Sequence, residues 1–169
     1  MKLLTNARVA NLLGALVCAG MMGFALFAQY GLDLEPCPLC VLQRVAVIAM
    51  GLLFAVAALH GPGRAGGIVY GALVAIAAGA GAGVAGRQVW LQNLPKDQVP
   101  ACGPGLDFML DTFGLGEALQ MVLSGSGECA DVAWRFLGLS MPTWVFLWCV
   151  ALGGFALWAN WRPRGGRAT

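Results

Sequence analysis

The sequence predicts an all-α membrane protein, an antiparallel bundle of four transmembrane helices with two loops on one side of the membrane. Hydrophobic residues make up 59% of the chain and charged residues only 11%, whereas a soluble domain carries about 25% charged residues. Four apolar runs, at residues 9–28, 41–59, 67–86 and 141–161, account for most of this excess. The net charge of +2 is dispersed without a basic stripe, so nucleic acid is not an expected partner.

The first run, residues 9–28, is long enough to cross a bilayer core of about 30 Å as a helix. Lys2 and Arg8 precede it, so a secretory signal peptide is the competing interpretation. The run exceeds the roughly 7–15 apolar residues of a signal peptide, and its last residues, LFA, form a poor cleavage site. We therefore expect a retained transmembrane helix.

The second run, residues 41–59, is interrupted only by Gln43 and Arg44. Without its first four residues it would be about 22 Å long, which is too short to cross the membrane. We therefore place Arg44 within the outer edge of the second helix. Helix breakers at residues 60–66 form a tight turn, which makes the next helix antiparallel.

The third run, residues 67–86, contains Gly67-x-x-x-Gly71 and Gly79-x-x-x-Gly83. This spacing of small residues lets membrane helices approach closely, although glycine is also merely tolerated in lipid. We therefore expect the third helix to be central in the bundle.

The fourth run, residues 141–161, carries two tryptophans near each end, as the two membrane interfaces favour. The loops are residues 29–40 and 87–140, and the longer one holds six of the eight acidic residues. Apolar residues recur at helical spacing within 106–113 and 119–123. They predict short amphipathic helices that lie on the membrane surface or pack against the outer ends of the bundle.

The distribution of lysine and arginine predicts that both termini are inside. With that orientation all eight acidic residues and both loops lie outside. In a bacterium the outer face is the oxidising periplasm, where disulfides persist. The basic residues assigned to the inner side are Lys2, Arg8, Arg64, Arg162, Arg164 and Arg167.

Two cysteines stand directly before the second helix, in the segment PCPLCVLQR at residues 36–44. Cys37 and Cys40 can close a small disulfide ring if their Cα atoms come within about 7 Å. A helix that begins near Pro38 would favour the thiolate of Cys40, which is the reactive species. Cys18 and Cys149 lie inside apolar runs, and we expect them to be small buried hydrophobes.

Cys102 and Cys129 lie in the long outer loop. Four outer cysteines allow three pairings, and the sequence does not choose among them. One interpretation is a relay, in which a mobile loop pair exchanges with a soluble partner and then with the fixed pair. The alternatives are a static disulfide that staples the loop and a structural zinc site, although zinc sites usually use two closely spaced pairs.

Electrons that reach Cys37 and Cys40 need an acceptor. The sequence has no Cys-x-x-Cys-His haem motif and only one histidine. A lipid-soluble quinone could reach Cys40 laterally. Arg44 is four residues beyond Cys40 on the same helix face, where its charge could stabilise a thiolate and a developing quinone oxyanion. The alternative role for Arg44 is an anchor to lipid headgroups.

The segment PCPLCVLQR resembles the DsbB family of disulfide-bond-forming oxidases of the bacterial inner membrane. The segments PACGPG at residues 100–105, GECA at 127–130 and WRFLGLSMP at 134–142 extend the resemblance. The resemblance covers essentially the whole chain, which it assigns to a single membrane domain, residues 1–169.

The resemblance implies a thiol:quinone oxidoreductase with specific roles for the matching positions. Cys102–Cys129 would accept electrons from a periplasmic DsbA-like protein of thioredoxin fold, with Cys102 forming the mixed disulfide. The Cys37–Cys40 disulfide would reoxidise that pair and leave Cys40 as the thiolate facing ubiquinone, or menaquinone. Arg44 matches the family's quinone-site arginine. Pocket residues on the other helices are not fixed by the motifs, and Arg87 and Gln88 are the candidates.

Two further interpretations remain open from the sequence. A quinone reductase resembling vitamin K epoxide reductase also combines a helix bundle, Cys-x-x-Cys and quinone, but its loop cysteines precede its membrane pair. A non-enzymatic membrane scaffold with two structural disulfides would keep all four outer cysteines oxidised in the presence of a reduced partner.

Overall fold

The chain folds into a bundle of four long helices. The structure, a computed structural model, describes residues 6–95, 97–101, 108, 111–112, 114–132 and 134–161. The long helices are α1 (Ala7–Gly31), α2 (Pro38–His60), α3 (Arg64–Gln92) and α7 (Met141–Trp161). All four are long and apolar enough to cross a membrane. The predicted all-α, four-helix membrane fold is therefore confirmed.

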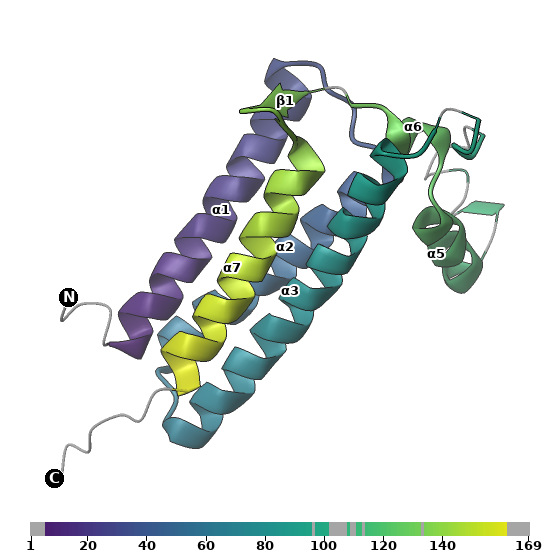
Figure 1. The fold of residues 1–169 in the computed structure, drawn as a ribbon. Helices are drawn as coiled ribbons and strands as arrows, with labels where there is room; N and C mark the ends of the chain where they lie inside the picture. Colours follow the sequence, from purple (N-terminus) through teal and green to yellow (C-terminus); the bar gives the residue numbers. More distant parts are fainter. Residues whose placement is uncertain are drawn as a thin grey trace, which may run out of the picture.

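The two ends of the bundle differ in what they carry (Figure 1). At one end α1 begins, α7 ends and α2 turns into α3 through Gly61; we call this the terminal end. The opposite end, which we call the cysteine end, carries Cys37 and Cys129. Short elements of the long loop gather there, namely α5 (Leu115–Ser124), α6 (Gly127–Ala130), β1 (Arg135–Phe136) and β2 (Leu139–Ser140).

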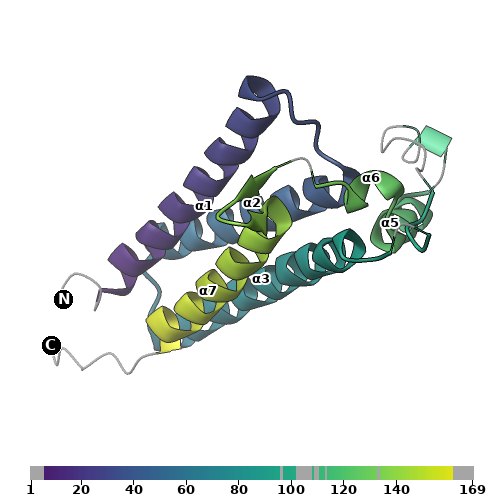
Figure 2. The same ribbon diagram turned by 45° about the horizontal axis from the view of Figure 1, so that its top comes forward.

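The helices pack mainly in the pairs α1–α2, α2–α3 and α3–α7, whereas α1 and α7 have few contacts. Figure 2 shows α1 diverging from α7 toward the cysteine end. The middle of the bundle is filled by a cluster of buried apolar side chains. Its members include Cys18, Val47, Met50, Phe54, Val74, Ala78, Cys149 and Leu152.

Glycines allow α3 to lie close against its neighbours, but only some of the predicted ones do so. An added Cβ at Gly71 would come within 3.1 Å of a side chain of α7, and one at Gly81 within 3.0 Å of the Cys149 Sγ atom. The prediction for Gly79 and Gly83 is wrong, because both are exposed with open space around them. The buried face of α3 follows positions 67, 71, 74, 78 and 81 instead.

Two buried asparagines join α1 to α7 near the terminal end. The Asn11 amide donates to Asn160 Oδ1 over 3.0 Å, and the Asn160 amide donates to Asn11 Oδ1 over 3.1 Å. Both side chains are at most 2% exposed. Reciprocal amide bonds satisfy polar groups that would otherwise be costly inside a membrane bundle, so the pair fixes α1 against α7.

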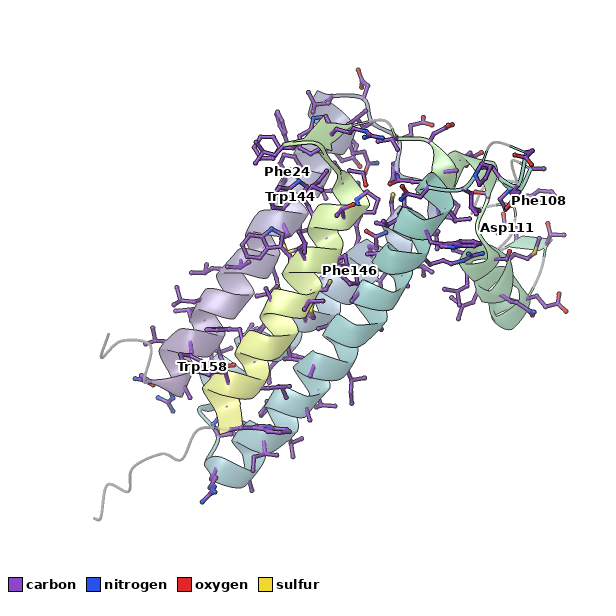
Figure 3. All side chains as sticks on the ribbon, viewed as in Figure 1. Phe24, Phe108, Asp111, Trp144, Phe146 and Trp158 are labelled. Carbon is purple, nitrogen blue, oxygen red and sulfur yellow. The ribbon has the colours of Figure 1, made fainter. Side chains whose placement is uncertain are left out.

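A short hairpin, which the sequence did not predict, leads into α7. Arg135 pairs with Ser140. The Phe136 ring stacks on Trp134 and lies tilted against Trp144 of α7, and Trp134 in turn packs against Phe24 of α1. Trp144 donates its indole N–H to the Phe136 carbonyl over 3.1 Å. Figure 3 shows Phe24 and Trp144 on this side of the cysteine end. The hairpin therefore spans the space between the outer ends of α1 and α7.

The helix α5 is amphipathic, and only some of its apolar residues are buried. Ala118 and Val122 are buried against the bundle, whereas Leu119 and Leu123 are 46% and 41% exposed. One face of the piece predicted within 119–123 therefore packs on the bundle. Most of the other predicted piece, within 106–113, lies outside the described residues.

Candidate functional site

Cys37 and Cys40 lie together at the first turn of α2. Cys37 is the N-cap residue, with φ −66° and ψ 163°, and its sulfur accepts a hydrogen bond from the Cys40 N–H over 3.4 Å. Pro38 occupies the first helical position, where its fixed φ suits the helix and its missing N–H is not needed. The two Sγ atoms lie 2.8 Å apart. The helix start therefore positions both sulfurs for exchange, with the positive end of the helix dipole beside them.

A glutamine of α3 contacts both sulfurs. The Gln88 side-chain nitrogen lies 3.3 Å from the Cys37 Sγ atom and 3.4 Å from the Cys40 Sγ atom. Its oxygen accepts a hydrogen bond of 2.6 Å from Gln43 Nε2. Gln43 and Gln88 are 4% and 3% exposed. Because Gln43 can donate only to the amide oxygen, it keeps the Gln88 N–H groups directed at sulfur.

Arg44 extends from α2 toward α1. Its guanidinium donates to the Gln29 side-chain oxygen and, over 3.1 Å, to the Ala25 carbonyl. Arg44 is half-buried and lines the same cavity as Cys40. The two bonds to α1 hold a permanent positive charge one helical turn below the cysteine pair.

A cavity of about 300 Å³ lies beside the cysteine pair. Its apolar walls come largely from α1 and α7, and its polar groups come from α2, α3 and the loop. Both α1 and α7, which have few contacts with each other, contribute residues to its lining. Residues of the walls include Met21, Met22, Ala25 and Val145, and the polar groups include Cys37, Cys40, Arg44 and Gln88.

Cys129, on α6, is fully buried and lies beside Cys37. The pKa of Cys129 is lowered to about 5, mainly because the Cys37 thiol donates a hydrogen bond to its sulfur. Burial opposes this shift, and the N–H groups of Leu39 and Ser126 add to it. The pKa of Cys37 is raised because its thiol hydrogen bonds to Cys129 and to Cys40 favour the protonated form. Cys37 is thus a thiol between two sulfur partners.

The segment that carries Cys129 packs on α2 and α3. Cys129 shares a buried cluster with Leu39, Leu91 and Val122. At the first residue of α6, the Gly127 N–H donates to the Ala101 carbonyl over 3.3 Å. Cys102 itself lies outside the described residues.

The structure thus brings Cys37, Cys40, Cys129 and Arg44 to one end of the bundle. Cys18 and Cys149 are buried in the middle of the bundle, as predicted. Gln88, one of the two candidates, lines the cavity, whereas Arg87 does not and instead faces α5.

Sequence reasoning missed the role of Gln43 and left Gln88 as a candidate only. Both residues lie on the buried face of their helix. That periodicity was a usable signal, because a polar side chain on a buried face of a membrane helix needs a partner. Among the described residues no group of three or more His, Cys, Asp or Glu side chains is placed to hold a metal ion.

Comparisons with known proteins agree with this arrangement. The family profile described as "Disulfide bond formation protein DsbB" matches residues 7–159. A protein of Chromobacterium violaceum named "Disulfide bond formation protein B" is 55% identical over 163 residues, which cover 96% of this chain and 98% of that protein. Proteins with the same name from Hahella chejuensis and Nitrosococcus oceani are 54% and 53% identical, and the matches cover 95% of this chain in both cases and 98% and 95% of those proteins.

A match of this extent settles the family and the class of chemistry. The family's name describes disulfide bond formation, which accords with thiols gathered at one end of a four-helix membrane bundle. The chain belongs to the DsbB family and is a multi-pass membrane disulfide oxidoreductase.

Proposed function

We propose that this protein, acting as a single membrane domain over residues 1–169, oxidises a periplasmic DsbA-like dithiol protein of thioredoxin fold. The electron pair passes through Cys102/Cys129 and Cys37/Cys40 to a membrane quinone, ubiquinone or menaquinone. The observation that carries the proposal is the position of Cys37. Its sulfur contacts both Cys129 of the loop and Cys40, which lines the cavity.

The first step is exchange between the partner and the loop pair. A thiolate of the partner attacks Cys102 of a Cys102–Cys129 disulfide, forms a mixed disulfide and releases the Cys129 thiolate. The second partner thiolate then attacks the mixed disulfide and releases Cys102. The partner has lost two electrons, and the loop pair has gained them as two thiols. The hydrogen bond between Gly127 and Ala101 supports this pairing, because it holds the residue before Cys102 beside the start of α6.

The second step moves the electrons into Cys37 and Cys40, which we call the membrane pair. The Cys129 thiolate attacks Cys37 of a Cys37–Cys40 disulfide, so the Cys129–Cys37 bond forms and Cys40 leaves as a thiolate. Cys102 then attacks Cys129, which restores the loop disulfide and releases Cys37 as a thiol. The N–H groups of Leu39 and Ser126 support Cys129 as the nucleophile, because they hydrogen bond to its sulfur and favour the thiolate while Cys37 is held in a disulfide. The start of α2 and the Gln88 amide favour Cys40 as the leaving thiolate.

The cavity fits a quinone headgroup. Its volume of about 300 Å³ is at the lower end of the range of about 300–1,000 Å³ typical of ligand pockets. Its walls are largely apolar, and Arg44 and Gln88 supply polar groups near Cys40. A bound quinone supplies an acceptor for two electrons and two protons. Arg44 would stabilise negative charge at Cys40 and at the acceptor's oxygen, and the sparse packing of α1 on α7 supports lateral entry from lipid.

The basic residues support an orientation in the bacterial inner membrane. Arg8 and Arg64 lie at the terminal end, and the acidic Glu35, Glu128 and Asp131 lie around the cavity at the cysteine end. We therefore place both termini in the cytoplasm and the cysteines in the periplasm. That orientation also puts the thiols where a disulfide-forming partner would work.

The test uses purified protein with a reduced DsbA-like protein and ubiquinone under anaerobic conditions. The proposal expects oxidation of the partner together with quinone reduction, and loss of both in Cys40→Ser. The matched control is Cys149→Ala, which removes a buried thiol outside the site and should retain turnover. Full turnover of Cys40→Ser would contradict the proposal. A reduced partner variant that lacks its second cysteine should accumulate a complex with the wild-type chain linked through Cys102, because its thiolate attacks the Cys102–Cys129 disulfide and no second partner thiolate releases it.

A further inference from the structure

The Arg87 side chain of α3 forms hydrogen bonds to the C-terminal end of α5. Its Nε atom donates to the Leu123 carbonyl over 3.3 Å, and a terminal nitrogen donates to the Ser124 carbonyl over 2.9 Å. These are the last two residues of α5, whose carbonyls have no partner within the helix. A cation at this end also suits the helix dipole. The guanidinium lies 4.2 Å from the ring centroid of Trp90, which fixes its position further.

A second contact between this segment and α3 lies one turn farther along α3. Gly125, with φ +83°, follows α5 directly, and a Cβ added there would collide with the Leu91 side chain. Leu91 is fully buried in the cluster that contains Cys129 and Leu39. The chain therefore makes a close approach to α3 four residues before Cys129, and only a residue without a side chain fits there.

A second side chain of α3, Gln92, contacts the residue that directly follows α6. Gln92 Nε2 donates to the Asp131 carbonyl over 3.5 Å, a long and weak bond. The stretch from Ser124 to Asp131, which includes α6 and Cys129, is thus bracketed by Arg87 before it and Gln92 after it. Of the two contacts, the paired, shorter and charged one at Arg87 is the stronger.

We propose that Arg87 is a positioning residue, which pins the end of α5 to α3 and thereby keeps Cys129 in contact with Cys37. This inference rests on the proposed relay, in which those two sulfurs exchange. The exchange needs direct contact between sulfurs. For a cysteine in a loop as long as the one between α3 and α7, contact depends on its effective concentration at the target. Arg87 raises that concentration without touching either sulfur.

The role is separable from quinone chemistry. Arg87 does not line the cavity beside Cys40. A small dithiol such as dithiothreitol can reduce the Cys37–Cys40 disulfide without the loop, so its oxidation tests the membrane pair and the quinone site alone. Loss of the hydrogen bonds between Arg87 and α5 should therefore slow turnover with the protein partner and leave turnover with dithiothreitol unchanged.

The direct measurement is the stability of a Cys37–Cys129 disulfide in the full chain. In a Cys40→Ser/Cys102→Ser background, the purified protein is equilibrated with a glutathione buffer, in which oxidised glutathione yields two thiols as the bond forms. Peptide mass spectrometry then gives the effective concentration of the pair. We expect Arg87→Gln to lower it about tenfold, the size expected for losing charge-assisted hydrogen bonds at a partly exposed site. Arg87→Lys should lie between, since a lysine reaches the two carbonyls less well.

The matched control is Arg135→Gln, which removes another arginine at the cysteine end, on the exposed hairpin strand β1. It should leave the effective concentration unchanged. An unchanged effective concentration in Arg87→Gln would overturn the proposal and leave Arg87 as a headgroup anchor. A parallel loss of dithiothreitol-driven quinone reduction would also overturn it, because Arg87 would then support the whole bundle. If the wild-type chain did not reduce quinone at all, the proposed function would be contradicted. The glutathione measurement would still test whether Arg87 positions Cys129.

Discussion

The side-chain nitrogen of Gln88 lies 3.4 Å from the Sγ atom of Cys40. An amide places a neutral donor beside the sulfur at every pH at which the protein works. Its N–H groups can stabilise negative charge on either sulfur of the membrane pair, since the nitrogen is 3.3 Å from Cys37 as well.

Replacing this donor should slow the chemistry of the membrane pair. We expect Gln88→Met to lower dithiothreitol-driven quinone reduction by about tenfold or more, the effect of losing a hydrogen bond to a charged group. Gln88→Glu should be slower still, because a carboxylate beside two sulfurs disfavours thiolate. Steady-state turnover measures both. Gln98→Met, in the exposed loop, is the control, and equal rates in Gln88→Met and wild type would remove Gln88 from the site.

Gln43 should act only through Gln88. Its N–H group donates to the Gln88 oxygen over 2.6 Å and fixes which way that amide faces. We expect Gln43→Leu to cost less activity than Gln88→Met. The double variant should be no slower than Gln88→Met alone, because the effect of Gln43 passes through the residue already lost. Independent, additive losses in this double-mutant cycle would contradict the dependence.

The reduced protein should show a thiolate at unusually low pH. The pKa of Cys129 falls from 9.0 to about 5, first because of the hydrogen bond from Cys37. The ultraviolet absorbance of thiolate, taken as the difference from Cys129→Ser, should rise with a midpoint near pH 5. Cys37→Ala should move that midpoint toward the ordinary value. A midpoint that stays near 5 in Cys37→Ala would show that the contact is not the cause.

The same shift affects stability. Because the folded pKa of Cys129 is the lower one, the thiolate stabilises the reduced fold fully above the unfolded value of 9.0. This contribution declines below pH 9 and is lost as the pH falls through about 5. Denaturation of reduced protein across this window should therefore depend on pH more steeply than that of Cys129→Ser.

Arg44 should matter more for quinone use than for folding. It is held by Gln29 and the Ala25 carbonyl of α1, so its charge is fixed near Cys40. We expect Arg44→Ala to weaken the apparent quinone affinity and to lower turnover about a hundredfold, as for removal of one preorganised electrostatic group. Arg64→Ala, at the terminal end, is the control. Unchanged quinone kinetics in Arg44→Ala would leave Arg44 as a lipid anchor.

Much of the fold was predictable because the apolar runs are long and the acidic residues are confined to the loops. Details of helix packing were less so. Both Gly79 and Gly81 are small residues of α3, yet only Gly81 faces a neighbour. The two positions differ by about 200° around the helix, and the pattern of small residues does not say which face meets α7.

The residues of the site could be predicted from the sequence, but the contacts between residues far apart in the chain could not. The Cys-x-x-Cys pair and Arg44 follow from local spacing on one helix. The contact between Cys37 and Cys129 joins residues far apart in the chain, and it depends on how α5 and α6 pack on Leu39 and Leu91. Loop packing of this kind leaves no periodic pattern in the sequence, and the same holds for the two-residue strands of the hairpin.

The most direct test of the account is the stoichiometry of a single turnover. Protein loaded with ubiquinone is mixed anaerobically with less than one equivalent of reduced DsbA-like partner, and quinol and partner disulfide are both counted. The relay predicts one quinol for each partner disulfide formed in the wild type. In Cys37→Ala it predicts partner disulfide without quinol, because the electrons stop at the loop pair. Partner disulfide without quinol in the wild type, or quinol in Cys37→Ala, would contradict the passage of electrons through Cys37.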